Sequence, residues 1–140
     1  MSFLSMVPGV SVRCCLLVLC AGKAWAATEL RCDVSYAGGT QTVVAQPVQD
    51  PYAVPAVDVH GRFRFKAVMV GVGDRIERIN LYVQQKTPTQ PVILQQAKYL
   101  PPFHWPGDGA PLALTGQQRL YASPVERELI YSCALHRSRP

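Results

Sequence analysis

The most regular alternation of hydrophobic and polar residues lies near the middle of the chain, in two runs of β-favouring residues at 62–72 and 76–86. Gly73 between the runs can adopt the positive φ of a tight turn, and Asp74 suits the next turn position. Along the first run, one set of alternate residues is apolar and the other is basic. The apolar set is Phe63, Phe65, Ala67 and Met69, and the basic set is Arg62, Arg64 and Lys66. This pattern predicts a long β-hairpin at the centre of the fold.

The hairpin departs from strict alternation at one end. Between 68 and 72 both faces of the first arm become apolar, which predicts that this end is covered on both sides. In the second arm Ile76 falls out of phase with the residues that follow it. Three later residues of this arm share one apolar face: Ile79, Leu81 and Val83. An extra residue near Glu77-Arg78 would reset the alternation, so we expect a β-bulge there.

Shorter alternating runs on both sides of the hairpin predict further strands. These runs cover 29–36, 41–46, 91–99, 118–122 and 126–135, with a short extended piece at 57–60. In the first run Cys32 lies on the apolar face, and in the last run Cys133 does the same. Between 47 and 55 a proline occurs every four residues, which favours a sheet edge or a loop because proline donates no backbone hydrogen bond.

About seven strands, turn signals between them and no helix predict an all-β fold. We expect a single antiparallel β-sandwich, immunoglobulin-like or related, with one disulfide, in a domain spanning 27–140. The immunoglobulin type itself stays open. Trp105, the only tryptophan of this domain, falls in an irregular segment and not at the strand position typical of that fold.

Residues 1–26 have the pattern of a secretory signal peptide. Arg13 precedes a short apolar core at 14–22, and Ala24-Trp25-Ala26 forms an A-x-A site, so we expect cleavage after Ala26. This predicts a periplasmic or secreted protein. The alternative is a lipid anchor on Cys20, although Leu19 stands where lipoprotein processing normally requires a small residue. The apolar core is far shorter than the roughly 20 residues that span a bilayer, so no transmembrane segment is expected.

Removal of the leader leaves two cysteines, Cys32 and Cys133. Two cysteines in an exported protein predict a disulfide, here between the first and the last strand. The alternative is a pair of buried free thiols.

Charge argues against two classes of partner. The full chain has a net charge of +5, and the leader accounts for two of these charges through Arg13 and Lys23, which leaves +3. The remaining basic residues are scattered singly, without the basic stripe that follows a phosphate backbone, so we expect neither a nucleic-acid partner nor a strongly acidic one. A short basic row formed by Arg62, Arg64 and Lys66 is either an anion-binding surface or an ordinary solvent face.

The best candidate for function is a proline-rich aromatic loop at 99–111. It contains four candidate contact residues: Tyr99, Phe103, His104 and Trp105. Aromatic residues on a stiff loop are frequent hot spots of binding, because little entropy is lost when they make contact. The sequence therefore predicts a non-catalytic binding or accessory module for a protein or small ligand, with an envelope protein as one possible partner. In the alternative interpretation, Phe103 and Trp105 cap the open end of the sandwich.

Two other classes of function have weaker support in the sequence. Asp58 and His60 would share a face of an extended strand and could bind one metal ion. Zinc and copper sites need three or four convergent ligands, and the histidines are widely spaced, so we expect no metal or other cofactor. No G-x-S-x-G turn is present and both remaining cysteines are expected to be oxidised, so we expect no enzyme and no catalytic residues. A structural subunit of an envelope assembly is a further alternative, which predicts an exposed apolar strand edge.

Overall fold

The computed structural model describes residues 27–125 and 127–137. The predicted leader at 1–26, its cleavage after Ala26 and the alternative anchor at Cys20 lie outside the described residues. Within the described ranges, no helix is long and apolar enough to cross a membrane.

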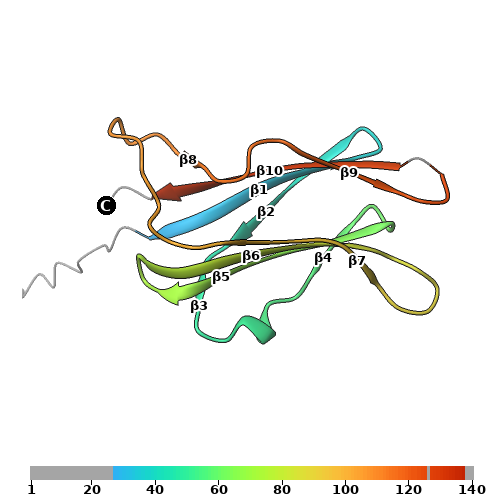
Figure 1. Ribbon diagram of the computed structural model, residues 1–140, viewed down its shortest axis with the longest axis horizontal. Coiled ribbons are helices and arrows are strands. Elements are labelled where there is room, and N and C mark those ends of the chain that lie inside the picture. The colour runs from blue at the N-terminus through green and yellow to red at the C-terminus, as the bar shows by residue number, and fades with distance from the viewer. Residues whose placement is uncertain (1–26, 126, 138–140) are drawn as a thin grey trace, which may run out of the picture.

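The described residues form an all-β fold of two five-stranded sheets that lie face to face (Figure 1). The first sheet contains β1 (Thr28–Tyr36), β2 (Gly39–Ala45), β8 (Leu112–Ala113), β9 (Gln118–Ala122) and β10 (Arg127–Arg137). The second sheet contains β3 (Pro47–Val48), β4 (Val57–Val59), β5 (Phe63–Val72), β6 (Arg75–Gln85) and β7 (Val92–Tyr99). One short 3-10 turn, η1 (Pro51–Ala53), lies between β3 and β4.

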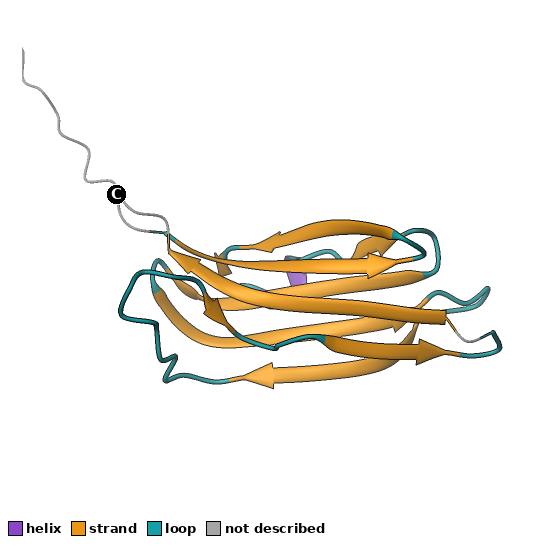
Figure 2. Ribbon diagram, turned by 90° about the horizontal axis from the view of Figure 1, so that it is seen from above, coloured by secondary structure: helices purple, strands orange, loops and turns teal. Residues whose placement is uncertain are grey.

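The order of strands explains why there are more of them than the seven expected. In the first sheet the order is β2-β1-β10, and β8 and β9 share the free edge of β10. In the second sheet β3 and β4 share one edge of β5, which is followed by β6 and β7. Each sheet is thus four positions wide, with one edge position divided between two short strands (Figure 2). Such short edge strands limit unwanted pairing with other chains.

The prediction of a purely antiparallel fold is wrong at one edge, because β3 runs parallel to β5. The cause is the crossing of the chain from one sheet to the other. β2 ends at Ala45, and Pro47, which has no backbone N–H to continue the first ladder, opens β3 in the second sheet. The chain then turns back through η1 and pairs with β5 again as the antiparallel strand β4.

Alternation correctly predicts which side chains form the core between the sheets. The inward residues of three strands are buried, and one cluster joins both sheets. These are Leu30, Cys32 and Val34 of β1, Phe63, Phe65, Ala67 and Met69 of β5, and Leu129, Tyr131, Cys133 and Leu135 of β10. The expected double cover at the end of β5 is present at Val68 and Val70, which are buried, but Val72 is 59% exposed. The turn η1 contacts β5.

The central hairpin has the predicted turn and the predicted bulge. Val72 pairs with Arg75 across the turn, and Gly73 has a φ of 62°. Val70 lies opposite Arg78 and Gly71 opposite Ile76, so the intervening Glu77 is the extra residue. The bulge brings the two backbones close together at Gly71, where only glycine fits. A second register shift, at Leu94 in β7, was not predicted.

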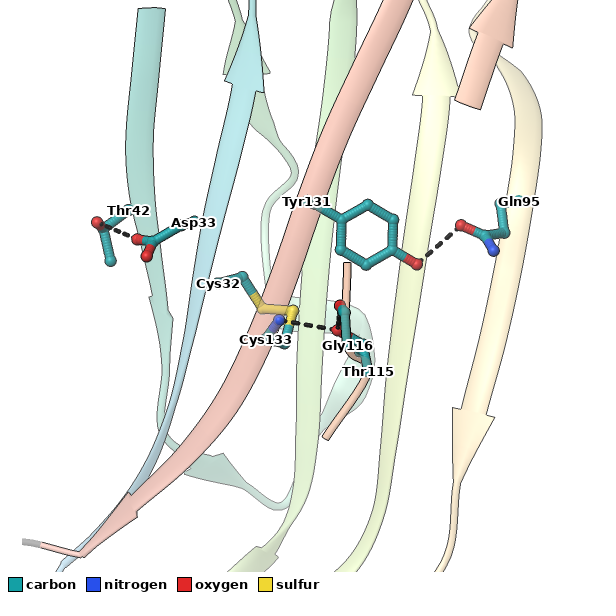
Figure 3. The surroundings of a disulfide bond; sticks show 8 residues. All are labelled: Cys32, Asp33, Thr42, Gln95, Thr115, Gly116, Tyr131 and Cys133. Carbon is teal, nitrogen blue, oxygen red and sulfur yellow. Dashed lines mark hydrogen bonds between the residues drawn. A yellow bond between two sulfur atoms is a disulfide. The ribbon is translucent and has the colours of Figure 1, made fainter. Parts of the chain in front are cut away.

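The predicted disulfide joins Cys32 to Cys133, which lie directly opposite each other in the β1–β10 ladder (Figure 3). The backbone N–H of Cys133 donates to Thr115 Oγ1 (2.9 Å), and its carbonyl oxygen accepts from the N–H of Leu114 (2.9 Å). Both groups therefore face away from β1. The cysteines form a non-hydrogen-bonded pair, the position where Cα atoms of antiparallel strands are closest, here 4.0 Å apart. In immunoglobulin domains the disulfide instead joins the two sheets.

A hydrogen bond between side chains connects the two layers. The hydroxyl of Tyr131, on β10, donates to Gln95 Oε1, on β7, at 2.8 Å (Figure 3). The ring of Tyr131 also packs against Phe65 of the opposite sheet, with a centroid distance of 5.2 Å. Burial raises the pKa of Tyr131 to about 12. The tyrosine thus joins apolar packing and a polar contact across the core.

Replacing Gly71 with alanine should destabilise the fold by about 1–3 kcal/mol, because a Cβ there would overlap the carbonyl oxygen of Arg75. Urea unfolding of Gly71→Ala and of Gly107→Ala provides a matched comparison. A Cβ at Gly107 meets no atom within 4 Å, so that variant should unfold like the wild type. Equal unfolding midpoints for the two variants would contradict the bulge geometry.

Removing the disulfide should lower stability by roughly 4–5 kcal/mol, the chain-entropy value for a closed loop of about 100 residues. The measurement is urea unfolding of oxidised wild-type protein, of reduced protein and of Cys32→Ala/Cys133→Ala. The reduced protein and the double variant should both be destabilised relative to the oxidised protein. If reduction leaves the midpoint unchanged, the bond does not constrain the unfolded chain.

Stability should fall as the pH rises above 10. The phenol of Tyr131 ionises near pH 10 in the unfolded chain but only at about 12 in the folded chain, so the unfolded state binds fewer protons between these values. Tyr131→Phe should cost about 1 kcal/mol at neutral pH and should weaken this alkaline loss. Denaturant unfolding at a series of pH values tests both effects, and an unchanged alkaline slope in the variant would contradict the assignment.

Candidate functional site

The predicted binding loop spans the open end between the two sheets. It leaves β7 of the second sheet at Tyr99 and crosses to β8 of the first sheet, running past the end of the core (Figure 1). Four prolines stiffen the loop: Pro101, Pro102, Pro106 and Pro111. At its far end the carboxylate of Asp108 accepts the N–H of Ala110 at 2.9 Å, which fixes a tight turn.

The aromatic residues of this loop divide between two sides. Phe103 and Trp105 are partly buried and pack against the core, as does Tyr99, whose pKa is raised by burial. The guanidinium carbon of Arg137, at the end of β10, lies 4.0 Å from the centre of the Trp105 ring. This cation–π contact fixes the tryptophan between the loop and the last strand. The loop aromatics therefore close the open end of the core.

His104, between the partly buried Phe103 and Trp105, is exposed. Leu100, at the start of the loop, is 59% exposed. The structure thus packs Tyr99, Phe103 and Trp105 against the core and leaves His104 and Leu100 exposed.

The other sequence candidates, Asp58 and His60, have different neighbours. The carboxylate of Asp58 accepts from Lys86 Nζ (2.7 Å) and from the N–H of Gly61 (2.8 Å). The bond from Lys86 is the main reason that the pKa of Asp58 is lowered. His60 covers Gly39 of the first sheet. Within 27–125 and 127–137, no group of three or more His, Cys, Asp or Glu residues is arranged to hold a metal ion.

The edge strand β7 has a mixed character. Val92 and Ile93 are 47% and 54% exposed at its start, but the bulge at Leu94 interrupts the ladder just beyond them. Lys98 is exposed near the other end. A bulge and a lysine are both features that oppose edge-to-edge pairing. The apolar edge that a structural subunit would present is therefore short.

One concave surface was missed by the sequence analysis. A groove of about 450 Å³ lies on the outer face of the first sheet. Among its lining residues are Arg31, Asp33, Thr42, Ala113, Ser132 and His136. Asp33 accepts the hydroxyl of Thr42 at 2.7 Å, as Figure 3 shows. These residues come from four strands, so alternation could assign them to outward positions but could not place them side by side.

Comparison with known proteins adds no relative to this description. No family model, no curated protein and no solved structure matches the chain.

Proposed function

We propose that this chain is an exported, non-catalytic binding module that acts through the loop at 99–111. The observation that carries the proposal is the two-sided arrangement of that loop. Phe103 and Trp105 attach it to the core, while Leu100 and His104 are exposed on its outer side. A loop that is rigid before contact loses little entropy on binding, and this favours its use for recognition.

The arrangement changes the role that the aromatic residues play in the proposal. Phe103 and Trp105 serve as anchors, and the contact surface consists of Leu100, His104 and the exposed prolines beside them. An exposed apolar side chain and an exposed imidazole on one loop suit a partner, such as an envelope protein, that offers both an apolar patch and a hydrogen-bonding group.

The disulfide supports the proposed compartment. A buried bond between the first and last strands is typical of proteins that fold in an oxidising environment. Together with the leader pattern at 1–26, this favours a periplasmic or secreted module with a sandwich fold.

Photo-crosslinking tests the proposed surface. A photoreactive residue at position 104, in protein exposed to a cell-envelope fraction, should capture a partner that mass spectrometry identifies. The same residue at position 90, in the loop that precedes β7 at the opposite end of the molecule, is the matched control. Capture at both positions alike, or at neither, would contradict the proposal.

Two sets of substitutions distinguish the residues that contact the partner from those that anchor the loop to the core. Leu100→Ser/His104→Ala should lose the captured partner and keep the wild-type unfolding midpoint. The control Thr89→Ala/Gln90→Ala should keep both the captured partner and the wild-type midpoint. Phe103→Ala or Trp105→Ala should each cost roughly 1–2 kcal/mol of stability, less than for a fully buried aromatic, because both side chains are partly buried.

A further inference from the structure

Positive charge gathers on the outer face of the second sheet. Four cations alternate with inward residues of the core and so point outward: Arg64, Lys66, Arg78 and Lys98. The ion pairs among the described residues are Glu29–Arg31, Asp58–Lys86 and Arg119–Glu128, and none includes these four. The strands that form this face contain two carboxylates: Asp58, which pairs with Lys86 and lies directly opposite Arg64, and Glu77, the extra residue of the bulge.

The outer face of the first sheet is different. Its arginines, Arg31 and Arg119, are each paired with a glutamate of the same sheet, and Asp33 adds a further negative charge. The net positive charge of the described chain is therefore concentrated on one of its two broad faces. Such a segregated field attracts an anionic partner to that face.

The residues between the cations narrow the chemistry of the partner. Lys66 lies opposite Tyr82 in the ladder, and Tyr82 lies opposite Gln96. Asn80 and Gln84 flank Tyr82 on the same face of β6. Side-chain amides donate and accept hydrogen bonds, so they suit the hydroxyl groups of a sugar, and a half-buried tyrosine ring offers an apolar surface to the C–H groups of a pyranose.

A pocket of about 370 Å³ lies at one end of this face. Arg64 and Lys86 line it together with Thr87 and Asp58. Asp58 holds the Lys86 ammonium at 2.7 Å and lies opposite Arg64 in the β4–β5 ladder, so the pocket has two cations around one carboxylate. The hydroxyl of Thr87 donates to the carbonyl oxygen of Gln90 at 2.6 Å, which leaves the two cations as the groups that face an anion. Their excess over the single carboxylate attracts a carboxylate or sulfate carried by a sugar ring.

We infer that the outer face of the second sheet binds an acidic polysaccharide, with one acidic sugar in the Arg64–Lys86 pocket. Outward residues two apart on a strand are roughly 6.7 Å apart, so Arg64 and Lys66 can contact successive parts of an extended chain. A lipid surface fits less well, because the exposed apolar residues Ile93 and Val72 lie at opposite ends of the strands and form no common insertion surface. The amides together with the Tyr82 ring suit the hydroxyl and C–H groups of a sugar, which favours a polysaccharide over an acidic polypeptide.

Titration with polygalacturonate at low and at high salt tests the inference, with neutral dextran as the uncharged control. Wild-type protein should bind polygalacturonate in a salt-dependent way and should not bind dextran. Lys66→Gln/Lys98→Gln should weaken binding by about tenfold, as expected for the loss of two surface charge contacts. Arg31→Gln/Arg119→Gln removes the same charge from the opposite face and should change the affinity by less than about twofold. Equal losses for the two pairs would mean attraction to net charge alone and would overturn the inference.

Two further comparisons identify the class of partner. Gln84→Ala/Gln96→Ala should weaken binding to polygalacturonate, and wild-type protein should bind polyglutamate and phosphatidylglycerol vesicles more weakly than polygalacturonate. Equal or tighter binding to either competitor, or an amide variant without effect, would overturn the assignment to a polysaccharide.

Lys98→Gln alone, on the exposed edge strand, replaces Lys66→Gln/Lys98→Gln if that double variant fails to fold, and it should also bind polygalacturonate more weakly than the wild type. Leu100→Ser/His104→Ala should bind polygalacturonate like the wild type, so failure of this inference and failure of the proposed loop function are distinguishable.

Discussion

The pairing of β1 with β10 is the constraint on which the rest of the structure depends. These strands stand near the two ends of the described chain, and their ladder runs from Thr28–Arg137 to Tyr36–Leu129. The Cys32–Cys133 bond crosses the ladder on its core side. A contact between such distant residues is entropically costly to form, and a covalent bond lowers that cost by restricting the unfolded chain. Every other strand must then be placed within a loop whose ends are already joined.

The two sheets meet around apolar residues, but the ends of the space between them need separate closure. At one end, Phe103 and Trp105 fill the opening, with Arg137 stacked on the tryptophan. The same contacts that complete the core also fix the loop in one position. Stability and recognition are therefore linked in the proposed site, because the inward side of the loop stabilises the fold and the outward side is available for contact.

The broad outer faces of the two sheets differ in net charge, although the sequences of their strands show no obvious difference. In the first sheet, cross-strand and local ion pairs neutralise the arginines. In the second sheet the cations lie beside amides, a tyrosine and valines. Like charges on one face repel each other, which costs stability at low salt, and an anionic partner would remove that cost. This physical asymmetry supports a second recognition surface that is separate from the loop.

The sequence alone predicted the longer strands, their inward residues, a bulge near Glu77-Arg78 and the disulfide, but not the two-residue strands β3 and β8. Alternation and turn chemistry depend on residues that are close in the sequence, and two cysteines after the predicted leader can pair in only one way. These features can therefore be predicted without knowing which strands are neighbours. The tertiary structure decided the parallel pairing of β3, the inward direction of Phe103 and Trp105, and the gathering of Arg64, Lys66, Arg78 and Lys98 on one face. These features depend on the order of strands and on how the two sheets pack. Both are set by contacts between residues far apart in the chain, and the period of a single strand holds no information about them.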